Sequence, residues 1–473
     1  MSTRQDRITL GVIVGHRGFF PAHLVDKGRD EILRVLKEEG INSVVLSPEE
    51  TKHGAVETRD DAKKCAELFR KNSSDIAGIL ITLPNFGDER GIAEAIRMAN
   101  LKVPILIHAY PDEPNKMRQD NRRDSFCGKM SVCNNLNQYG FRYSLTRHHT
   151  VHPDSEDFRE DVRWFTKVCR VVNGLPKARI GAIGTRPAPF ATVRYSEKLL
   201  ERAGISVEVI DLSEIFSRIQ HLTERDEIVQ RKLKAIKKYV LGQKLSPEIL
   251  LRMAKFAGVV ETWMQENELV ATAIQCWTSV QENYGISPCL IMSMMSESLL
   301  PSACEVDVEG AVAMYALQLA SGNPSALADW NNNFGRDPDK VVMFHCSNWP
   351  KSILKDILVD YHDIISGAVE KEKTYGVCEG RIKSGPVTFA RIATDDSAGT
   401  IHAYVGEGEF TGDQLSTFGG CGVMRVKRLP ELLQFICNNG FEHHVAINPS
   451  SVAKVLQHAI ENYLGWNVYY HRS

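Results

Sequence analysis

Two acidic side chains stand close together in the segment PSACEVDVEGA, residues 301–311. Glu305 and Asp307 are two residues apart, so in an extended segment both carboxylates point to the same face. Such a pair attracts a divalent cation, which offsets the repulsion between the two charges. Gly310 permits a tight turn into the helical pattern that follows, and the alternative is therefore a helix N-terminus capped by Asp307. Spacing alone leaves both a metal site and a helix cap open.

Three histidines occupy positions that suit an active site. His345 ends the apolar run of KVVMFHC, where a polar side chain reaches a crevice, although a hydrogen-bonded core histidine fits the pattern equally well. His443 and His444 are adjacent, and their side chains point in opposite directions if the segment is extended. One of them then binds a metal while the other supports it; the alternative for such a pair is a place on the surface.

Gln275 and Trp277, in AIQCWTS, lie at the end of another predicted strand. An aromatic ring stacks on the apolar face of a sugar and an amide hydrogen bonds to its hydroxyls, so the pair indicates a carbohydrate site unless Trp277 belongs to the core. The loop GAIGTRPAPF lacks the further glycines of a dinucleotide site. The polar cluster from Arg122 to Asp124 suits either a binding loop or a subunit interface.

The spacing of apolar runs predicts the elements that position these residues. In the first part of the chain, short Val/Ile/Leu runs alternate with amphipathic stretches, which is typical of a parallel sheet covered on both faces. Loops after three of these runs, at residues 15–18, 83–85 and 108–110, lie at the edge where such sheets bind ligands. A second series of the same kind opens at ARIGAIG and ends at KVVMFHC. From about Gly376, period-two alternation broken by turns predicts an antiparallel sheet or barrel.

We therefore expect an α/β protein with two tandem doubly wound α/β domains followed by a mostly antiparallel, barrel-like β domain. A chain of 473 residues requires such a division, because a single core stops growing near ~250–300 residues. The expected boundaries are 1–172 for the first α/β domain, 173–350 for the central domain with the acidic site, and 351–473 for the β domain.

Composition excludes several classes of partner. The net charge is −2 and no block of Lys or Arg occurs, so we expect no nucleic acid as a ligand. No uninterrupted apolar run reaches the ~18 residues of a membrane span, and we expect a soluble protein without membrane contact. The short polar segment at the N-terminus lacks the apolar run and cleavage site of a secretory signal peptide. The 11 cysteines form no CxxC pair. Reduced thiols and a cytoplasmic location are the resulting expectations.

Seven motifs together resemble one enzyme family along nearly the whole chain: GVIVGHRGFF, RRDSFCGKMSVCNNL, IGTRPAPFATVRYSEKLLERAGI, QCW, ACEVDVEGA, VVMFHC and HHVAINP. Their order and spacing are similar to those of the L-fucose and L-arabinose isomerases, in the shorter fucose-isomerase-like branch. The resemblance implies two α/β domains and a barrel-like domain, in a homo-oligomer whose active sites are shared between neighbouring subunits. It also implies Mn²⁺ or a similar divalent cation held by two acids and a histidine.

The resemblance also directs the assignment of roles. The family's first carboxylate falls near Cys289 in this sequence, where the nearest acid is Glu282. Glu305 is therefore expected to perform the role of that missing carboxylate. The implied metal ligands are Glu305, Asp307 and His444, with His443 second in line. A bound cation stabilises an enediol intermediate, and Glu305 and Asp307 are the candidates for moving the proton between the two carbons.

The implied reaction interconverts an aldose and its ketose, and the branch covers L-fucose, D-arabinose and, in some members, sulfoquinovose. A sulfonate calls for guanidinium groups, which Arg17, Arg186 or Arg194 can supply. A non-catalytic sugar-binding or sugar-sensing protein is the alternative, disfavoured because a receptor does not need an acid pair. The residues expected to orient the hydroxyls and the ring of the sugar are Arg17, Gln275, Trp277, His345 and His443.

Overall fold

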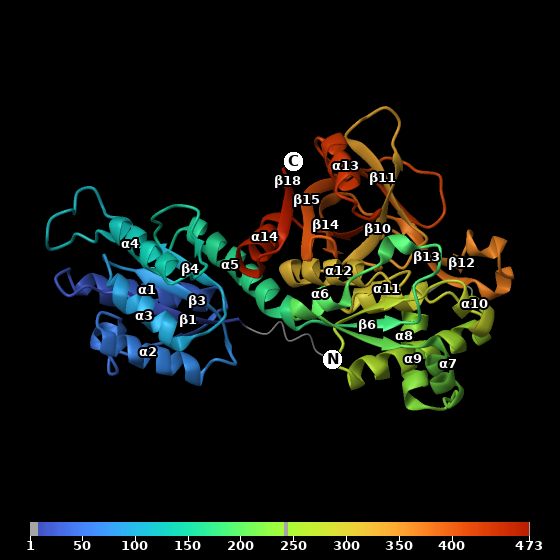
Figure 1. The fold of residues 1–473 in the computed structure, drawn as a ribbon, viewed down its shortest axis with the longest axis horizontal. Coiled ribbons are helices and arrows are strands. Elements are labelled where there is room, and N and C mark those ends of the chain that lie inside the picture. The colour runs from blue at the N-terminus through green and yellow to red at the C-terminus, as the bar shows by residue number, and fades with distance from the viewer. Residues whose placement is uncertain (1–7, 241–244, 473) are drawn as a thin grey trace. The chain divides into compact units, whose positions relative to one another are not determined.

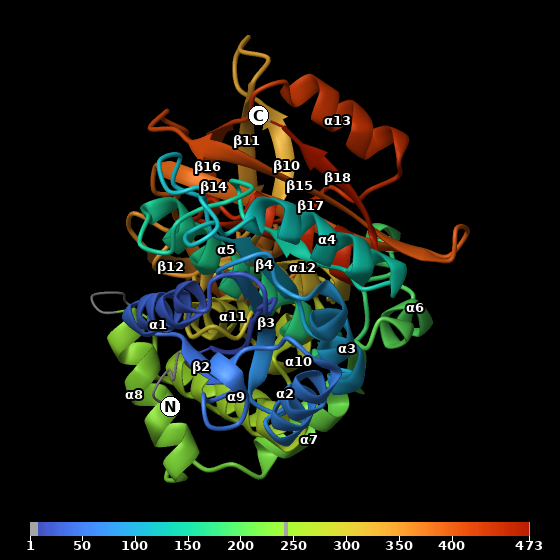
Figure 2. The same cartoon turned by 90° about the vertical axis from the view of Figure 1, so that its left-hand side faces the viewer.

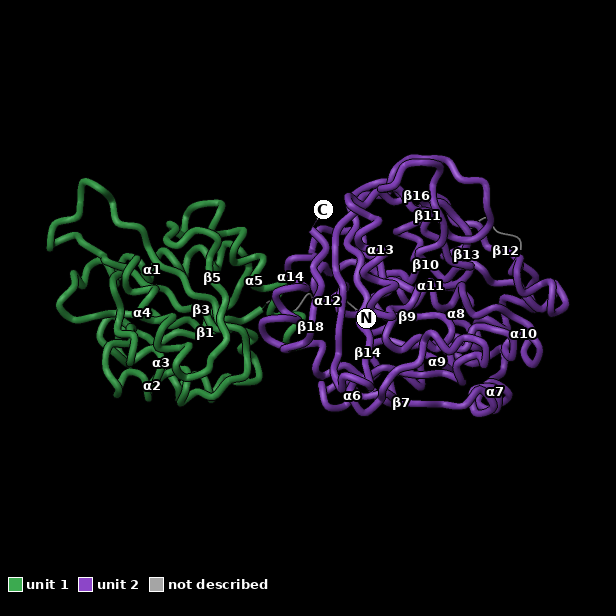
Figure 3. The backbone as a smooth tube through the Cα atoms, turned by 45° about the horizontal axis from the view of Figure 1, so that its top comes forward, with its two compact units in different colours: residues 1–173 green, residues 174–473 purple. Residues whose placement is uncertain are grey.

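The computed structural model describes residues 8–240 and 245–472 of the chain. Figure 1 shows the order of the helices and strands, which form two compact units, Met1–Asn173 and Gly174–Ser473, coloured separately in Figure 3. The predicted division of the second unit near residue 350 stays a prediction. In the described part of the chain, no helix has both the length and the apolar character that crossing a membrane requires.

The first unit is built on a parallel sheet, as its apolar runs predicted. The strands lie in the order β2-β1-β3-β4-β5, and each neighbouring pair is parallel. The strands are β1 (Thr9–Val14), β2 (Asn42–Val45), β3 (Ile76–Leu83), β4 (Ile105–Ala109) and β5 (Ser144–Leu145). The helices are α1 (His23–Glu38), α2 (Arg59–Lys71), α3 (Glu89–Ala99), α4 (Ser125–Gln138) and α5 (Glu156–Gly174).

Helices cover both faces of this sheet (Figure 2). On one face, Ile32 of α1 and Phe158 of α5 are buried in a common core with alternate side chains of the strands. On the other face, Phe69 of α2 and Ile92 of α3 are buried in a second core. Two apolar faces explain why the strands read as nearly continuous Val/Ile/Leu runs rather than as an alternating pattern.

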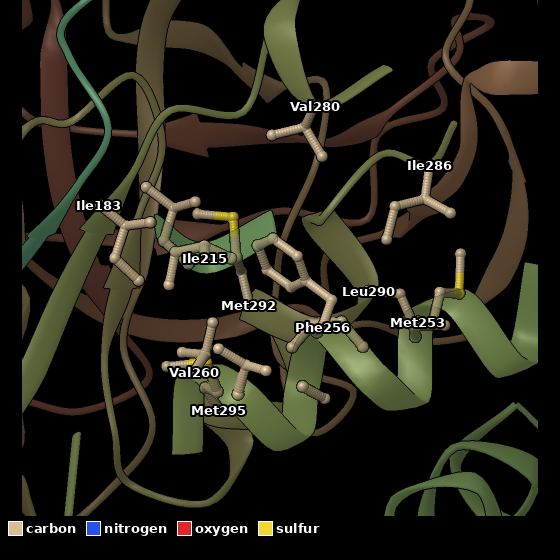
Figure 4. Close-up of a cluster of buried hydrophobic side chains, with 14 of the residues drawn as sticks. Ile183, Ile215, Met253, Phe256, Val260, Val280, Ile286, Leu290, Met292 and Met295 are labelled. Carbon is tan, nitrogen blue, oxygen red and sulfur yellow. The ribbon is translucent and has the colours of Figure 1, made fainter. Parts of the chain in front are cut away.

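The second unit begins with another parallel sheet, in the order β7-β6-β8-β9. Its strands are β6 (Arg179–Ile183), β7 (Ser206–Ile210), β8 (Ala271–Ile274) and β9 (Ser302–Ala303). Its helices are α6 (Glu197–Arg202), α7 (Leu212–Gln220), α8 (Glu227–Tyr239), α9 (Pro247–Glu266), α10 (Ser279–Tyr284), α11 (Cys289–Glu297) and α12 (Val308–Ser321). Phe256 of α9 lies at the centre of the core beside this sheet, with Ile183 of β6 and Met292 of α11 (Figure 4).

A nine-stranded, mostly antiparallel sheet completes the second unit, in the order β12-β13-β16-β11-β10-β17-β14-β15-β18. An additional pairing of β15 with β16 closes part of it into a ring, which confirms the barrel-like expectation. The strands are β10 (Ala326–Asn333), β11 (Lys340–His345), β12 (Leu358–Tyr361), β13 (Tyr375–Arg381), β14 (Gly385–Asp395), β15 (Thr400–Phe410), β16 (Gly420–Arg425), β17 (His444–Asn448) and β18 (Asn467–His471). Helices α13 (Leu429–Asn438) and α14 (Ala453–His458) accompany it.

The strand β11 differs from its sequence-based assignment. Its apolar run was expected to close the second α/β series, whereas it pairs antiparallel with β10 and β16 in the barrel. The reason is physical: a short apolar strand buried on both faces has the same composition in a parallel sheet and in a closed barrel. The consequence is that His345, at the end of β11, is carried by the barrel.

Candidate active site

The predicted acidic segment lies at the N-terminus of α12, a helix that contacts strands of both sheets of the second unit. The segment is not extended, contrary to the expectation: Glu305 and Val306 both have φ of 56°, and Val306 N donates to Ile274 O of β8. This left-handed backbone is costly for side chains with a Cβ, and the surrounding contacts hold it in place. It separates the two acids, so that Glu305 and Asp307 make different contacts.

Asp307 is fully buried, and both of its oxygen atoms are engaged. Oδ1 accepts a hydrogen bond from Gly310 N at 2.8 Å, so Asp307 is the N-cap of α12. Arg391 donates to both oxygens, at 2.6 and 3.1 Å, and His444 Nδ1 lies 2.9 Å from Oδ2. Although burial raises the pKa of Asp307, the positive charge of Arg391 and the contact with His444 outweigh it and hold the pKa well below its usual range. Asp307 is therefore an anion that orients other groups.

Arg391, on β14, is the centre of a buried ionic cluster that the sequence analysis missed. Besides Asp307, its Nε donates to Glu442 at 2.9 Å, and one amino group lies 3.6 Å from Glu309. Glu309 also accepts hydrogen bonds from the backbone and hydroxyl of Thr394, at 2.7 and 2.6 Å. Burial raises the pKa of Glu309 well above its usual range despite the attraction of Arg391.

A second group of side chains lies around the imidazole of His444 and consists of Glu305, His345, Asp329 and His444 itself. Glu305 Oε2 lies 3.7 Å from His345 Nε2 and 3.9 Å from His444 Nε2. His444 Nε2 also lies 3.5 Å from Asp329 Oδ1. In the described part of the chain, Glu305 Oε2 and Asp329 Oδ1 are shielded from solvent and accept no hydrogen bond. Glu305, His345 and His444 are placed so that one metal ion can contact all three.

The side chains in this group shift one another's pKa values. Burial raises the pKa of Asp329 to about 7, and the negative charge of Glu305 adds to the effect, while His444 opposes it. Burial also raises the pKa of Glu305 above its usual value, against the attraction of His444. The pKa of His345 is held well below its usual range by burial and by the charge of His444, so that its imidazole is neutral. Burial lowers the pKa of His444, but the contact with Asp307 and the negative charges of Glu305 and Asp329 outweigh it and raise the pKa. Carboxylate oxygens and deprotonated imidazole nitrogens together are a ligand set for a divalent cation.

Aromatic side chains lie beside Glu305 and the two adjacent histidines. Trp277 Nε1 donates to the other oxygen of Glu305, Oε1, at 3.0 Å. The ring of Phe190, in the loop after β6, lies 6.0 Å from Trp277, 5.5 Å from His443 and 5.6 Å from His444 between centroids. Phe190 was missed in the sequence, where nothing in IGTRPAPF distinguishes it from a core residue.

The remaining predicted residues divide between the two units. Gln275 accepts a hydrogen bond from Thr185 N at 2.9 Å, so it positions the loop after β6. His443 is exposed and lies 3.8 Å from Asp329, at the margin of the group. Arg17 belongs to the first unit, where it forms an ion pair with Glu89, and its predicted contact with substrate stays a prediction.

Neither residue considered for the missing carboxylate faces the group of Glu305. Glu282 is exposed on α10, while Cys289 is buried at the start of α11 beside Cys304. The second acid in the site is instead Asp329, which the sequence analysis did not single out. Its signal was a lone acid in the apolar run SALADW, where a charge needs a partner if the strand is buried.

A cavity of about 300 Å³ opens at the loop after β6. Its lining includes Arg186, Arg194 and Tyr195 from the loop that carries Phe190, and Val306, which directly follows Glu305. The guanidinium groups of Arg186 and Arg194 donate to backbone carbonyls of their own loop. In the described part of the chain neither forms an ion pair with a carboxylate, so this cavity has a positive lining.

Comparisons with known proteins decide the family. The family model described as the N-terminal domain of fucose/sulfoquinovose isomerase matches residues 11–176, and that of the L-fucose isomerase C-terminal domain matches residues 343–472. The chain belongs to the fucose/sulfoquinovose isomerase family. It is therefore an aldose–ketose isomerase.

Similar curated proteins carry one name, sulfoquinovose isomerase. That of Priestia megaterium is 24% identical over 464 residues, which cover 97% of each chain. That of Alkalicoccus urumqiensis is 23% identical over 376 residues, 79% of this chain and 81% of the relative. The similarity thus extends over both units of the isomerase.

The buried pair of Asp307 and Arg391 leads to a prediction about stability. Asp307→Asn or Arg391→Met leaves an uncompensated charge in the interior, and we expect the free energy of unfolding to fall by about 3–5 kcal/mol. Denaturant unfolding followed by circular dichroism measures it. As a control, Glu248→Gln, which breaks the exposed ion pair with Arg252 on α9, should change stability by less than about 1 kcal/mol. Equal small losses in all three variants would contradict the role given to the buried pair.

Proposed function

We propose that this isomerase is metal-dependent and converts a sulfonated hexose into its ketose through an enediol. The observation that carries the metal dependence is the pair of buried carboxylate oxygens, Glu305 Oε2 and Asp329 Oδ1, that accept no hydrogen bond in the described part of the chain. Leaving two such atoms unsatisfied is costly unless a cation binds them. A hard ion such as Mn²⁺ fits this set of oxygen and imidazole ligands.

The residues that would hold the ion are Glu305, His345 and His444, whose donor atoms lie close enough together to contact one ion, with Asp329 beside His444. His444 suits this role because Asp307 contacts its Nδ1 and thereby directs Nε2 toward both free carboxylate oxygens. Asp307 was predicted to bind the metal itself. Since its own oxygens are engaged by Arg391, Gly310 and His444, we assign it the role of a positioning residue instead.

The same carboxylates are suited to the proton transfer. Conversion of an aldose to a ketose moves the proton on C2 to C1, and the hydroxyl proton on O2 to O1. The bound ion would polarise these two oxygens and so make the proton on C2 more acidic. Asp329, whose Oδ1 lies 3.5 Å from His444 Nε2 and accepts no hydrogen bond in the described residues, is placed to take up and return this proton. Trp277 holds Glu305 through Oε1, and neutral His345 can exchange a proton with a hydroxyl of the sugar.

The first test of this function concerns the ligand set. Glu305→Gln and Asp329→Asn each remove a charge that balances the cation, so metal content after gel filtration should fall and turnover should drop by about a hundredfold or more. Asp307→Asn should weaken metal binding by about ten- to a hundredfold, as expected for a residue that orients a ligand. Elemental analysis and an assay of ketose formation with and without EDTA measure both quantities.

Two variants serve as controls for the ligand set. Asp337→Asn removes an exposed acid from the connection between β10 and β11, and Cys289→Ser changes the residue at the position of the family's first carboxylate; both should keep their metal. Full turnover of exhaustively chelated, metal-free protein would refute the metal dependence. Loss of metal in Cys289→Ser but not in Glu305→Gln would refute the ligand set alone.

The proposed substrate rests on the positive cavity at the loop after β6, whose lining includes Val306, the residue that follows Glu305. The relatives are named for sulfoquinovose, a hexose with a sulfonate on its terminal carbon, and this group needs charged donors. Arg186 and Arg194 line the cavity next to Val306 and have no carboxylate partner in the described residues. The cavity therefore suits the anionic end of a sugar whose first two carbons are at the metal.

The second test separates a sulfonated from a neutral substrate. Arg186→Ala or Arg194→Ala removes a charge-assisted contact worth about 1.5–3 kcal/mol, so KM for sulfoquinovose should rise roughly ten- to a hundredfold. KM for a neutral sugar such as L-fucose should change little, and Arg202→Ala, on the neighbouring helix α6, serves as the control. Equal small changes for both sugars in the two variants would favour a neutral substrate.

We also propose that the enzyme is a homo-oligomer. Phe126 and Met130, four residues apart on α4, are 51% and 53% exposed, and the ring of Phe126 packs only against His149, at 4.1 Å, among the aromatic contacts of the described residues. Neighbouring exposed apolar side chains on one helix face mark an interaction surface. A second copy of the chain is the partner that the family resemblance implies.

The third test addresses this surface. Phe126→Glu and Met130→Glu place charges on the exposed face of α4, and we expect analytical ultracentrifugation to show a smaller species. Leu358→Glu makes the same type of change at an exposed apolar residue of β12 in the second unit and should leave the assembly intact. A wild-type enzyme that sediments as an active monomer at working concentration would contradict the proposal.

A further inference from the structure

Thiol groups surround the side of Glu305 that faces away from the proposed catalytic metal. Cys276, which follows β8, lies with its Sγ 3.4 Å from Glu305 Oε1. Cys304 is adjacent to Glu305 in the chain, and Cys276 and Cys289 are its neighbouring thiols. These three cysteines are at most 3% exposed, and all 11 cysteines of the chain are free thiols.

Packing alone does not account for this arrangement. A buried cysteine is usually a small apolar side chain, and the pair Cys65 and Cys169 in the first unit fits that description. The cysteines at Glu305 differ because their sulfur atoms meet each other and a carboxylate. The donor atoms of Cys276, Cys304 and Glu305 all lie within 4.8 Å of one another. That spread is comparable with twice the ~2.3 Å bond between zinc and sulfur.

We propose that Cys276, Cys304 and Glu305 form a second metal site, for a soft or borderline cation such as Zn²⁺ or Cd²⁺. The two thiols lose their protons to solvent when the ion binds, and two thiolates and one carboxylate oxygen become its ligands. The site would lie directly beside the proposed catalytic one and share Glu305 with it.

The two sites differ in the chemistry of their ligands. Oε2 of Glu305 faces His345 and His444, whereas Oε1 faces Trp277 and Cys276. A hard ion prefers the side with oxygen and imidazole, and a soft ion prefers the thiols. Occupation of the thiol side would draw Glu305 away from its catalytic position. Zn²⁺ or Cd²⁺ would then inhibit the Mn²⁺-loaded enzyme, a consequence that rests on the proposed function, whereas binding itself does not.

The test adds Cd²⁺ to the full-length protein in the presence of saturating Mn²⁺. We expect the ultraviolet charge-transfer absorption of cadmium thiolate to appear and to saturate near one equivalent, with a parallel loss of isomerase activity. X-ray absorption at the zinc edge of Zn²⁺-loaded wild-type protein should show sulfur neighbours at about 2.3 Å. Only oxygen and nitrogen neighbours, or no thiolate absorption, would overturn the proposal without need of any variant.

Variants then assign the ligands. Cys276→Ser and Cys304→Ser should each weaken Cd²⁺ binding by more than about tenfold, since even residues outside the ligand shell change metal affinity by that factor. The double variant Cys65→Ser/Cys169→Ser removes two buried thiols from the first unit and should bind Cd²⁺ like the wild type. Absorption that persists in the Cys276 and Cys304 variants but disappears in the control would overturn the assignment. An inactive protein that still shows the thiolate signal would refute the proposed function and leave this site intact.

Discussion

The buried ion pair between Arg391 and Asp307 is the interaction on which the geometry of the site depends. It joins β14 of the barrel to the N-terminus of α12, and both partners are completely shielded from solvent. Asp307 also caps the helix and contacts His444 Nδ1, so one carboxylate fixes a helix, a strand and an imidazole together. Because a lone charge at this depth is strongly unfavourable, none of the three elements can shift without the others.

The charged side chains of the site form two groups, an inner one around this ion pair and an outer one. The inner group is neutralised by a permanent cation, the guanidinium of Arg391, which contacts Asp307 and Glu442. The outer group, with Glu305 and Asp329, has no such cation in the described residues and holds carboxyl groups with raised pKa values. The protein thus supplies a fixed charge where rigidity is needed, and under the proposed function an exchangeable ion would balance the outer charges.

Much of the fold could be predicted from the sequence, because strands buried on both faces leave continuous apolar runs and helices leave amphipathic ones. The assignment failed at β11, whose composition does not distinguish a parallel strand from a barrel strand. In the site, Glu305, His345 and His444 were singled out and lie together. The role of Asp307 and the presence of Asp329 were not predictable from spacing, since a left-handed turn at Glu305 and the pairing of distant strands decide which acids meet.

Asp329 and His444 lie directly opposite each other on the antiparallel strands β10 and β17. Side chains alternate between the two faces of a strand, so inserting or deleting a single residue within either strand would turn one of them to the other face. The exposed connection between β10 and β11 is free of that restriction and can change in length over evolutionary time. The divergence of related sequences is therefore constrained by strand register rather than by chain length. Relatives should differ in the lengths of their loops before they differ in which residues of β10 and β17 point to the site.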